Sequence, residues 1–236
     1  MTAHLSEATI RSWLRRGELV FAEALESVEL RAPSLLPDWS RADVAAHVAG
    51  NAVGLTNLLH WARTGIQTPM YASPEARLRD IAEWAARPES ELRAHVADTS
   101  AQLASAVDQL PTDAWHRLVR SALGREIRAS EVSWLRAREV WIHAADLGGN
   151  LSFDAFPADL VDALLDEITG ALGRRLGCPD VLLMPYDREQ QWRIAPADRP
   201  AAEAVPVRGT ASDLLAWASG RSSGSIAGRP TLPAWL

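Results

Sequence analysis

The feature that most constrains this chain is a series of long segments with helical periodicity in its first 150 residues. Apolar residues recur there every three or four positions, as they do on one face of an α-helix. The expected helices cover residues 10–28, 40–62, 74–110 with a break near Arg87-Pro88, and 130–148. Long amphipathic helices bury their apolar faces against one another, so the pattern predicts a four-helix bundle.

Local signals place the ends of these helices. Ser40 is a good N-cap, and Asp43 three residues later comes close to a capping box. Pro74 suits the first turn of a helix, Ser130 is expected to cap the last one, and Gly148-Gly149 is expected to end it. The connections at 63–73 and 114–128 are long, the second resembling a hairpin, and would provide walls for a site inside the bundle.

The character of the sequence changes after Gly149. A helical segment at 157–176 precedes three short strand-like runs, at 181–184, 191–194 and 204–207, and a last helix at 211–219. This order predicts a small α+β domain. We therefore expect an α+β protein of two domains, with a helical bundle over residues 1–150 and a smaller C-terminal α+β domain over residues 151–236 that closes over the site.

Composition limits the partners of the protein. A hydrophobic content of 47% over 236 residues allows a sizeable core. The net charge of −6 and the lack of a basic stripe argue against nucleic acid as a partner. Without an 18-residue apolar run or a signal peptide, a cytoplasmic protein with no membrane partner is expected. The single cysteine, Cys178, excludes an internal disulfide and lies in no motif that would make it a nucleophile.

Histidine and acidic residues follow a spacing that can bind a metal ion. Three pairs have an acidic residue four positions before a histidine, which places both side chains on one face of a helix; they are Asp43/His47, Glu91/His95 and Glu139/His143. With six histidines and thirty acidic residues, about one such pair is expected by chance. Spacing alone therefore leaves a solvated surface pair as the simpler interpretation.

The neighbours of these residues distinguish the pairs. Glu91/His95 lies among charged residues, as on an exposed face, whereas His47 and the Glu139/His143 pair lie among apolar ones. A buried glutamate is costly unless a partner neutralises its charge. Two imidazoles and one carboxylate would form a three-ligand site for a divalent metal with one position open. A core histidine satisfied by a hydrogen bond remains the alternative for His47 or His143 taken singly.

Several segments of the chain resemble one known family. They are residues 36–49, around His47, the loop from Trp61 through Pro69 to Arg77, residues 134–147, around Glu139 and His143, and the chain end from Gly220-Arg221 to Pro233-Ala234-Trp235-Leu236. Together they are similar to the DinB-like, mycothiol-dependent maleylpyruvate isomerases over nearly the whole chain. The resemblance implies a DinB-like bundle with His47, Glu139 and His143 as ligands of a divalent metal, expected to be zinc.

The resemblance also implies an activity. The thiol cofactor would be mycothiol and the substrate maleylpyruvate, as in gentisate breakdown. A metal-activated thiolate would add to the cis double bond, the resulting single bond would rotate, and elimination would give fumarylpyruvate and return the thiol.

Two arginines are candidate catalytic residues. Arg221 follows the last helix and Gly220, and a guanidinium can bind a substrate carboxylate through two hydrogen bonds. A solvated arginine at a helix C-terminus would be the ordinary interpretation, but the resemblance at Gly220-Arg221 favours the site. Arg77, in the matching loop, is a second candidate, and Asn51, one turn after His47, is a candidate for supporting the ligands.

Two other functions remain open from the sequence. A mycothiol S-transferase of the same superfamily would use the same thiolate to attack electrophiles irreversibly. A regulatory module that binds a metal without catalysis is the alternative from another class, and the open metal position and Arg221 argue against it. His and Glu ligands accept several metals, so the sequence does not identify the native one.

Overall fold

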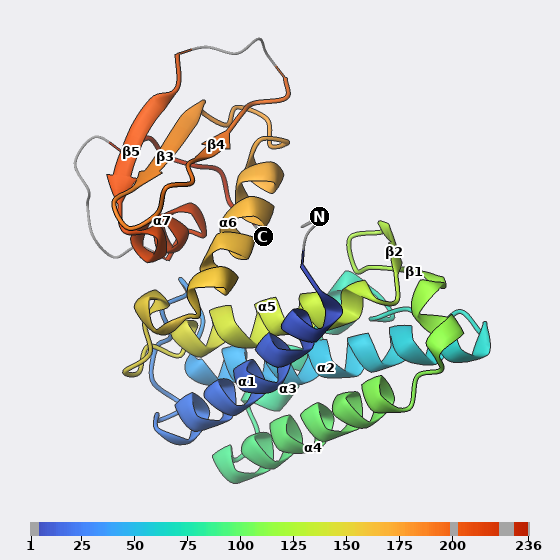
Figure 1. Ribbon diagram of the computed structural model, residues 1–236. Coiled ribbons are helices and arrows are strands. Elements are labelled where there is room, and N and C mark those ends of the chain that lie inside the picture. Colours follow the sequence, from blue (N-terminus) through green and yellow to red (C-terminus); the bar gives the residue numbers. More distant parts are fainter. Residues whose placement is uncertain (1–4, 199–202, 222–228, 236) are drawn as a thin grey trace. The chain divides into compact units, whose positions relative to one another are not determined.

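The computed structural model describes residues 5–198, 203–221 and 229–235, and these form two compact units (Figure 1). One unit, Ser6–Leu151, is helical, and the other covers Ser152–Leu236 and combines helices with a small sheet. The expected α+β fold class, with a helical N-terminal part and a smaller C-terminal part, is confirmed. None of the described helices is both long and apolar enough to cross a membrane.

The helical unit is built from five α-helices and a short hairpin. The helices are α1 (Glu7–Glu26), α2 (Arg41–Thr64), α3 (Pro74–Ala85), α4 (Glu89–Asp108) and α5 (Glu131–Asp146), and β1 (Leu118–Arg120) pairs antiparallel with β2 (Glu126–Arg128). The segment expected as one helix with a break is thus two helices, divided at Arg87-Pro88 because proline cannot continue the helix before it. The expected hairpin-like excursion is confirmed.

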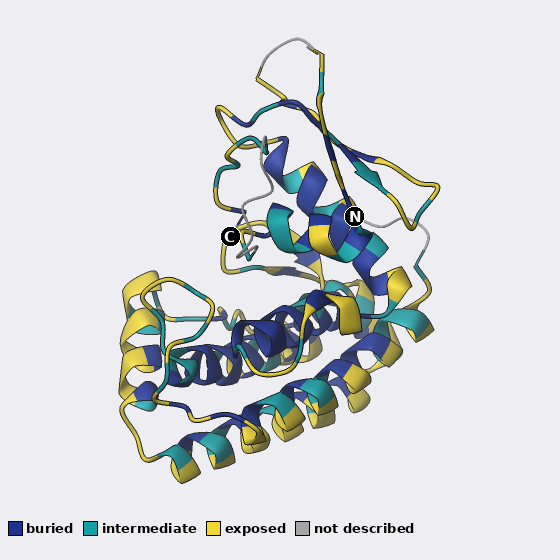
Figure 2. Ribbon diagram, turned by 90° about the vertical axis from the view of Figure 1, so that its left-hand side faces the viewer, coloured by how far each residue is buried: buried dark blue, intermediate teal, exposed yellow. Residues whose placement is uncertain are grey.

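Helix α2 is the central element of this unit. It packs against α3, α4 and α5, while α1 packs mainly on α5. Of its 24 residues, 14 are buried, so its surface is apolar on nearly all sides, as expected for a helix surrounded by others. Figure 2 shows the contrast with the outer helices, which are buried on one side and exposed on the other.

Caps explain where α2 and α3 begin, but not where α5 begins. Ser40 and Asp43 form the expected capping box, because the Asp43 N–H donates to Ser40 Oγ and the Ser40 N–H donates to Asp43 Oδ2. Pro74 occupies the first turn of α3, as expected. The expected cap of α5 is wrong in its detail: Ser130 stands at the N-cap position, but its backbone is helical and its side chain caps nothing.

A buried arginine joins four of these helices. Arg136 of α5 is 0% exposed and donates to the Glu18 carboxylate of α1, the Val48 carbonyl and Asn51 Oδ1 of α2, and Ser100 Oγ of α4. A close contact between α1 and α5 adds to this connection, because a Cβ at Gly17 would lie 2.6 Å from Val140 and 2.7 Å from Trp141. The relative position of α2 and α5 is therefore fixed by polar contacts as well as by packing.

The second unit contains a three-stranded mixed sheet in the order β4-β3-β5. Its elements are α6 (Ala158–Leu172), β3 (Val181–Pro185), β4 (Trp192–Ile194), β5 (Val205–Gly209) and α7 (Ala211–Ala218), close to the expected bounds. Strand β3 pairs antiparallel with β4 and parallel with β5. Both helices pack on this sheet and on each other.

The end of α7 determines the backbone path at Arg221. Gly220 has a φ of +79°, a left-handed conformation that glycine adopts without steric cost. Its N–H donates to the Trp217 carbonyl, and the Arg221 N–H donates to the Ala216 carbonyl, which closes the helix in a Schellman-like turn. The Arg221 side chain donates to the Ser219 carbonyl at 2.7 Å.

Candidate metal centre

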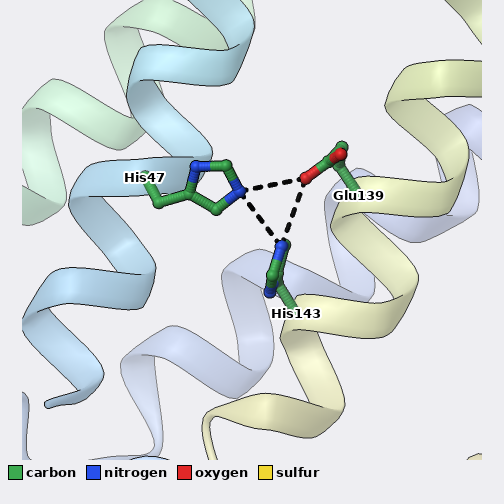
Figure 3. Close-up of side chains that lie close together, drawn as sticks. All are labelled: His47, Glu139 and His143. Carbon is green, nitrogen blue, oxygen red and sulfur yellow. Dashed lines mark hydrogen bonds and ion pairs between the residues drawn. The ribbon is translucent and has the colours of Figure 1, made fainter. Parts of the chain in front are cut away.

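Three side chains from two helices converge inside the helical unit. His47 extends from α2, and Glu139 and His143 extend from α5 one turn apart (Figure 3). Because α2 and α5 pack against each other, the two helices present these side chains to one point. Their exposed fractions are 7%, 9% and 8%, so they lie in the interior as their apolar neighbours in the sequence predicted.

The three facing atoms form a nearly equilateral triangle. His47 Nε2 lies 3.1 Å from Glu139 Oε2 and 3.1 Å from His143 Nε2, and His143 Nε2 lies 3.2 Å from Glu139 Oε2. Ligands of a tetrahedral zinc ion, at bond lengths near 2.05 Å, are separated by about 3.3–3.4 Å. The triangle therefore fits a divalent metal with a shift of only a few tenths of an ångström.

The pKa shifts of Glu139 and His47 favour the protonation states that bind a metal. Burial alone would raise the pKa of Glu139, but hydrogen bonds with His143 and His47 hold it well below its usual range, so this side chain is a carboxylate. Burial lowers the pKa of His47. The contacts with Glu139 raise it, the nearby charges of His143 and Arg77 lower it further, and the net shift is downward. A neutral imidazole and a carboxylate are the forms that bind metal.

Asp146 orients His143, and sequence reasoning missed it. Its Oδ2 lies 2.8 Å from His143 Nδ1, and the residue is 0% exposed. Burial would lower the pKa of His143, but the bonds to Asp146 and Glu139 raise it. With the Nδ1 proton donated to Asp146, a neutral His143 directs its Nε2 lone pair at the triangle. The spacing Glu-x-x-x-His-x-x-Asp was the available signal.

Arg77 lies beside the triangle, as its assignment to the site requires. Its Nη2 is 3.0 Å from His47 Nδ1 and its guanidinium carbon is 5.6 Å from the centre of the Tyr71 ring. A guanidinium only donates, so Nδ1 accepts this bond and the proton of a neutral His47 is on Nε2. To bind a metal through Nε2, His47 must move that proton to Nδ1, and Arg77 must then leave.

Arg138 contacts the triangle of side chains, whereas Asn51, which was expected to support it, does not. Arg138 Nη2 donates to Glu139 Oε1 at 3.4 Å, a contact that sequence reasoning did not foresee. Asn51, proposed as a support for the ligands, is buried but accepts a hydrogen bond from Arg136 instead. Asn51 therefore takes part in the link between helices.

The remaining sequence candidates lie in the second unit. Cys178 is 0% exposed, consistent with the expectation that it is not a nucleophile. Arg221 follows α7 in that unit, and its role at the metal site stays a prediction.

A cavity of about 290 Å³ adjoins His47. His47, Gly50, Val53 and Asn57 of α2 form one wall, Arg77, Asp80, Ile81 and Trp84 of α3 form another, and Tyr71 and His95 contribute from the preceding loop and from α4. The cavity thus brings together the candidate ligand His47 and the candidate catalytic Arg77, which a substrate or cofactor could reach together.

Two family models match the chain. The model described as "Mycothiol maleylpyruvate isomerase N-terminal domain" matches residues 3–148, and the model described as "MDMPI C-terminal domain" matches residues 155–234. No protein with a curated description matches the chain significantly.

Solved structures agree with the family models. A crystal structure of a mycothiol-dependent maleylpyruvate isomerase is similar at 34% identity, with 98% of each chain covered and a TM-score of 0.89. A structure of a histidine-to-alanine mutant of a protein with the same description has the same identity and coverage and a TM-score of 0.91. The similarity thus includes the helical unit, which holds the triangle of candidate ligands, and the second unit, which holds Arg221.

Proposed function

Because this chain belongs to the mycothiol maleylpyruvate isomerase family, we propose that it is an isomerase that converts maleylpyruvate to fumarylpyruvate with mycothiol and a divalent metal. The observation that carries the proposal is the buried triangle of His47, Glu139 and His143, which provides the donors that such a metal needs. Among the residues that the structure describes, three side chains meet at that point, fewer than the four ligands of a closed structural zinc site. An open position favours a catalytic site.

When bound, the metal would keep the sulfur of mycothiol in its thiolate form, which is the nucleophile that reversible addition to the cis double bond requires. Glu139 stays ionised at neutral pH and offsets the charge of the cation. Asp146 holds the His143 ring so that Nε2 points toward His47 and Glu139, where a metal would be bound. These side chains are largely buried, and charge interactions are stronger in a buried site than in water.

The arginines have a separate task. Addition to a double bond conjugated with an oxo group moves negative charge onto the oxygen, and that charge needs a fixed cation. Arg77 lines the cavity beside His47, and once it leaves His47 Nδ1 its guanidinium can bind a carboxylate or the developing oxyanion. Arg221 is proposed as the second cation, from the C-terminal domain, which we propose closes over the site.

A turnover assay with purified protein tests the proposal. Maleylpyruvate should be converted to fumarylpyruvate only when mycothiol is added, and the mycothiol concentration should be the same before and after. Consumption of one thiol per turnover would indicate an S-transferase, and metal binding without turnover would indicate a regulatory module. His47→Ala should lose both metal and activity.

A control variant separates an external thiol from an internal one. Cys178→Ser should keep most of the activity, because the only thiol of the chain is buried in the second unit. Turnover without added thiol, or loss of turnover in this variant, would contradict an external cofactor. A cytoplasmic location accords with a small thiol as cofactor and is part of the same proposal.

A further inference from the structure

Gly50 is unusual among the glycines of the helices. A glycine in a helix interior costs roughly 1 kcal/mol relative to alanine, so it needs a reason. Gly17 and Gly54 have one, since a Cβ would lie 2.6 Å from Val140 at the first and 3.2 Å from Met70 at the second. At Gly50 a Cβ would meet no described atom within 4 Å. The bare backbone at Gly50 is therefore open to a molecule from outside the chain.

This open surface lies in the cavity, next to the metal centre. Gly50 is three residues after His47, so both lie on one face of α2, and Asn57 continues that face two turns further. At 1.5 Å per residue, the α2 wall from His47 to Asn57 is about 15 Å long. A ligand whose reactive end is at the metal has room to extend along α2 over Gly50.

The chemistry of the walls indicates what kind of group would lie there. Asp80 forms no hydrogen bond or ion pair with any described residue, and Asn57 donates to the Pro69 and Met70 carbonyls, which leaves its Oδ1 as an acceptor. Trp84 stacks flat on His95, with ring centroids 3.5 Å apart at 3°, and gives the cavity a rigid aromatic wall. Acceptor oxygens beside aromatic surface suit a neutral ligand with hydroxyl groups on an apolar carbon ring.

Charge distinguishes the two molecules of the proposed reaction. Maleylpyruvate has two carboxylates, which Arg77 can bind beside His47, whereas the Asp80 carboxylate, further along α3, would repel them from the rest of the cavity. Mycothiol is an acetylated cysteine joined to glucosamine and inositol, so beyond its thiol it is a neutral chain of hydroxylated rings. The cavity, at about 290 Å³, lies near the lower end of the range of small-molecule sites, which is roughly 300–1,000 Å³. It would therefore hold part of the mycothiol molecule.

We infer that the cavity over Gly50, between α2, α3 and α4, is the subsite for the sugar part of the thiol cofactor, with Asp80 and Asn57 as acceptors for its hydroxyl groups. The inference rests on the proposed function. It makes Gly50 a specificity determinant, because any larger side chain at this position would occupy the volume of the sugar. The Cβ of that side chain would not clash with the protein itself.

The test compares two thiols in Gly50→Leu. The kcat/KM for mycothiol is divided by the kcat/KM for N-acetylcysteine, which has the thiol but no sugar, so that general damage cancels. The ratio should fall by about tenfold or more, equal to about 1.4 kcal/mol of lost discrimination. Gly170→Leu, in α6 of the second unit, is the matched control and should leave the ratio unchanged. An unchanged ratio in Gly50→Leu would overturn the inference, as would an effect confined to the KM for maleylpyruvate.

A binding measurement separates this inference from the proposed function. Calorimetric titration with N-acetylglucosaminylinositol, a neutral thiol-free analogue of mycothiol, should show binding to the metal-loaded parent and its loss in Gly50→Leu. Asp80→Asn should weaken the same binding. This second variant provides the test of the inference if Gly50→Leu does not fold. No binding to the parent would overturn the subsite even if the enzyme turns over. Binding without turnover of maleylpyruvate would leave the subsite in place and overturn the proposed function.

Discussion

At the scale of single residues, the candidate metal centre depends on which ring nitrogen of each histidine bears a proton. Asp146 fixes this for His143 in the form that can bind metal, whereas Arg77 fixes it for His47 in the opposite form. The two neighbours are thus expected to act in opposite directions on metal affinity. Each can be removed singly.

Asp146→Asn should weaken metal binding by roughly 10- to 100-fold, because the amide leaves the His143 ring without a charged acceptor to orient it. Competition with a chelator measures the affinity. Asp98→Asn, an exposed carboxylate on α4, is the control and should bind metal as the parent does. Equal affinities in Asp146→Asn and the parent would show that Asp146 does not support the ligand.

Arg77→Met should bind metal at least as tightly as the parent. The Arg77 guanidinium, 3.0 Å from His47 Nδ1, opposes the move of the His47 proton from Nε2 to Nδ1, and its positive charge repels the metal ion. Turnover should nevertheless fall by roughly a hundredfold through loss of the cation that faces the substrate. Metal analysis and steady-state kinetics on one preparation check both. Arg79→Met, exposed on the same helix, is the control. Loss of metal together with activity would make Arg77 a support of the ligands instead.

At the scale of elements, the site requires α2 and α5 to keep a fixed position relative to each other. Arg136 links α5 to α2 at the Val48 carbonyl, directly after the candidate ligand His47, and Glu18 of α1 neutralises the charge of Arg136. The link is made inside the core, where an unpaired charge or carbonyl is expensive. Its removal should affect the whole helical unit.

Arg136→Met should destabilise the protein by about 2–4 kcal/mol, less than for a fully buried ion pair because Glu18 is partly exposed. Denaturant unfolding of the metal-free protein measures this. Glu18→Gln in the same background should recover part of the loss, since no partly buried carboxylate is then left without its partner. Additive losses in the double variant would show that the two side chains are not coupled.

The ends of elements were predictable where one local signal decides them. The Ser40/Asp43 capping box, Pro74 and the break at Arg87-Pro88 act within a few residues of chain. Ser130 was misjudged because Glu131 accepts from the Arg128 N–H and the helix begins without a serine cap. The parallel pairing of β3 with β5 joins residues more than twenty positions apart, which no local pattern specifies.

At the scale of the whole molecule, the proposed reaction needs groups from both units. The helical unit holds the triangle of candidate ligands and Arg77, and the second unit holds Arg221. His47, Glu139 and His143 could be predicted as a set from spacing, apolar neighbours and the family resemblance. Asp146 had only its spacing from His143 to indicate it, and Arg136 had no signal, because charged residues lie on the surface by default and only the packed structure shows these two buried.

Arg221→Ala should lower kcat/KM by roughly a hundredfold, and Arg221→Lys should also be impaired because a lysine cannot bind a carboxylate through two parallel hydrogen bonds. Metal content should equal that of the parent, since Arg221 is not a proposed ligand. Arg208→Ala, exposed on β5, is the control. A kcat/KM for Arg221→Ala within about two- or threefold of the parent would remove Arg221 from the proposed mechanism.

The burial of Cys178 has a consequence for a protein that works with a free thiol. A low-molecular-weight thiol is always accompanied by some of its disulfide, which exchanges with any accessible protein thiolate to form a mixed disulfide. The only cysteine of this chain is 0% exposed, so such exchange has no sulfur to attack in the folded protein. The enzyme is thereby protected from covalent capture by the oxidised form of its own cofactor.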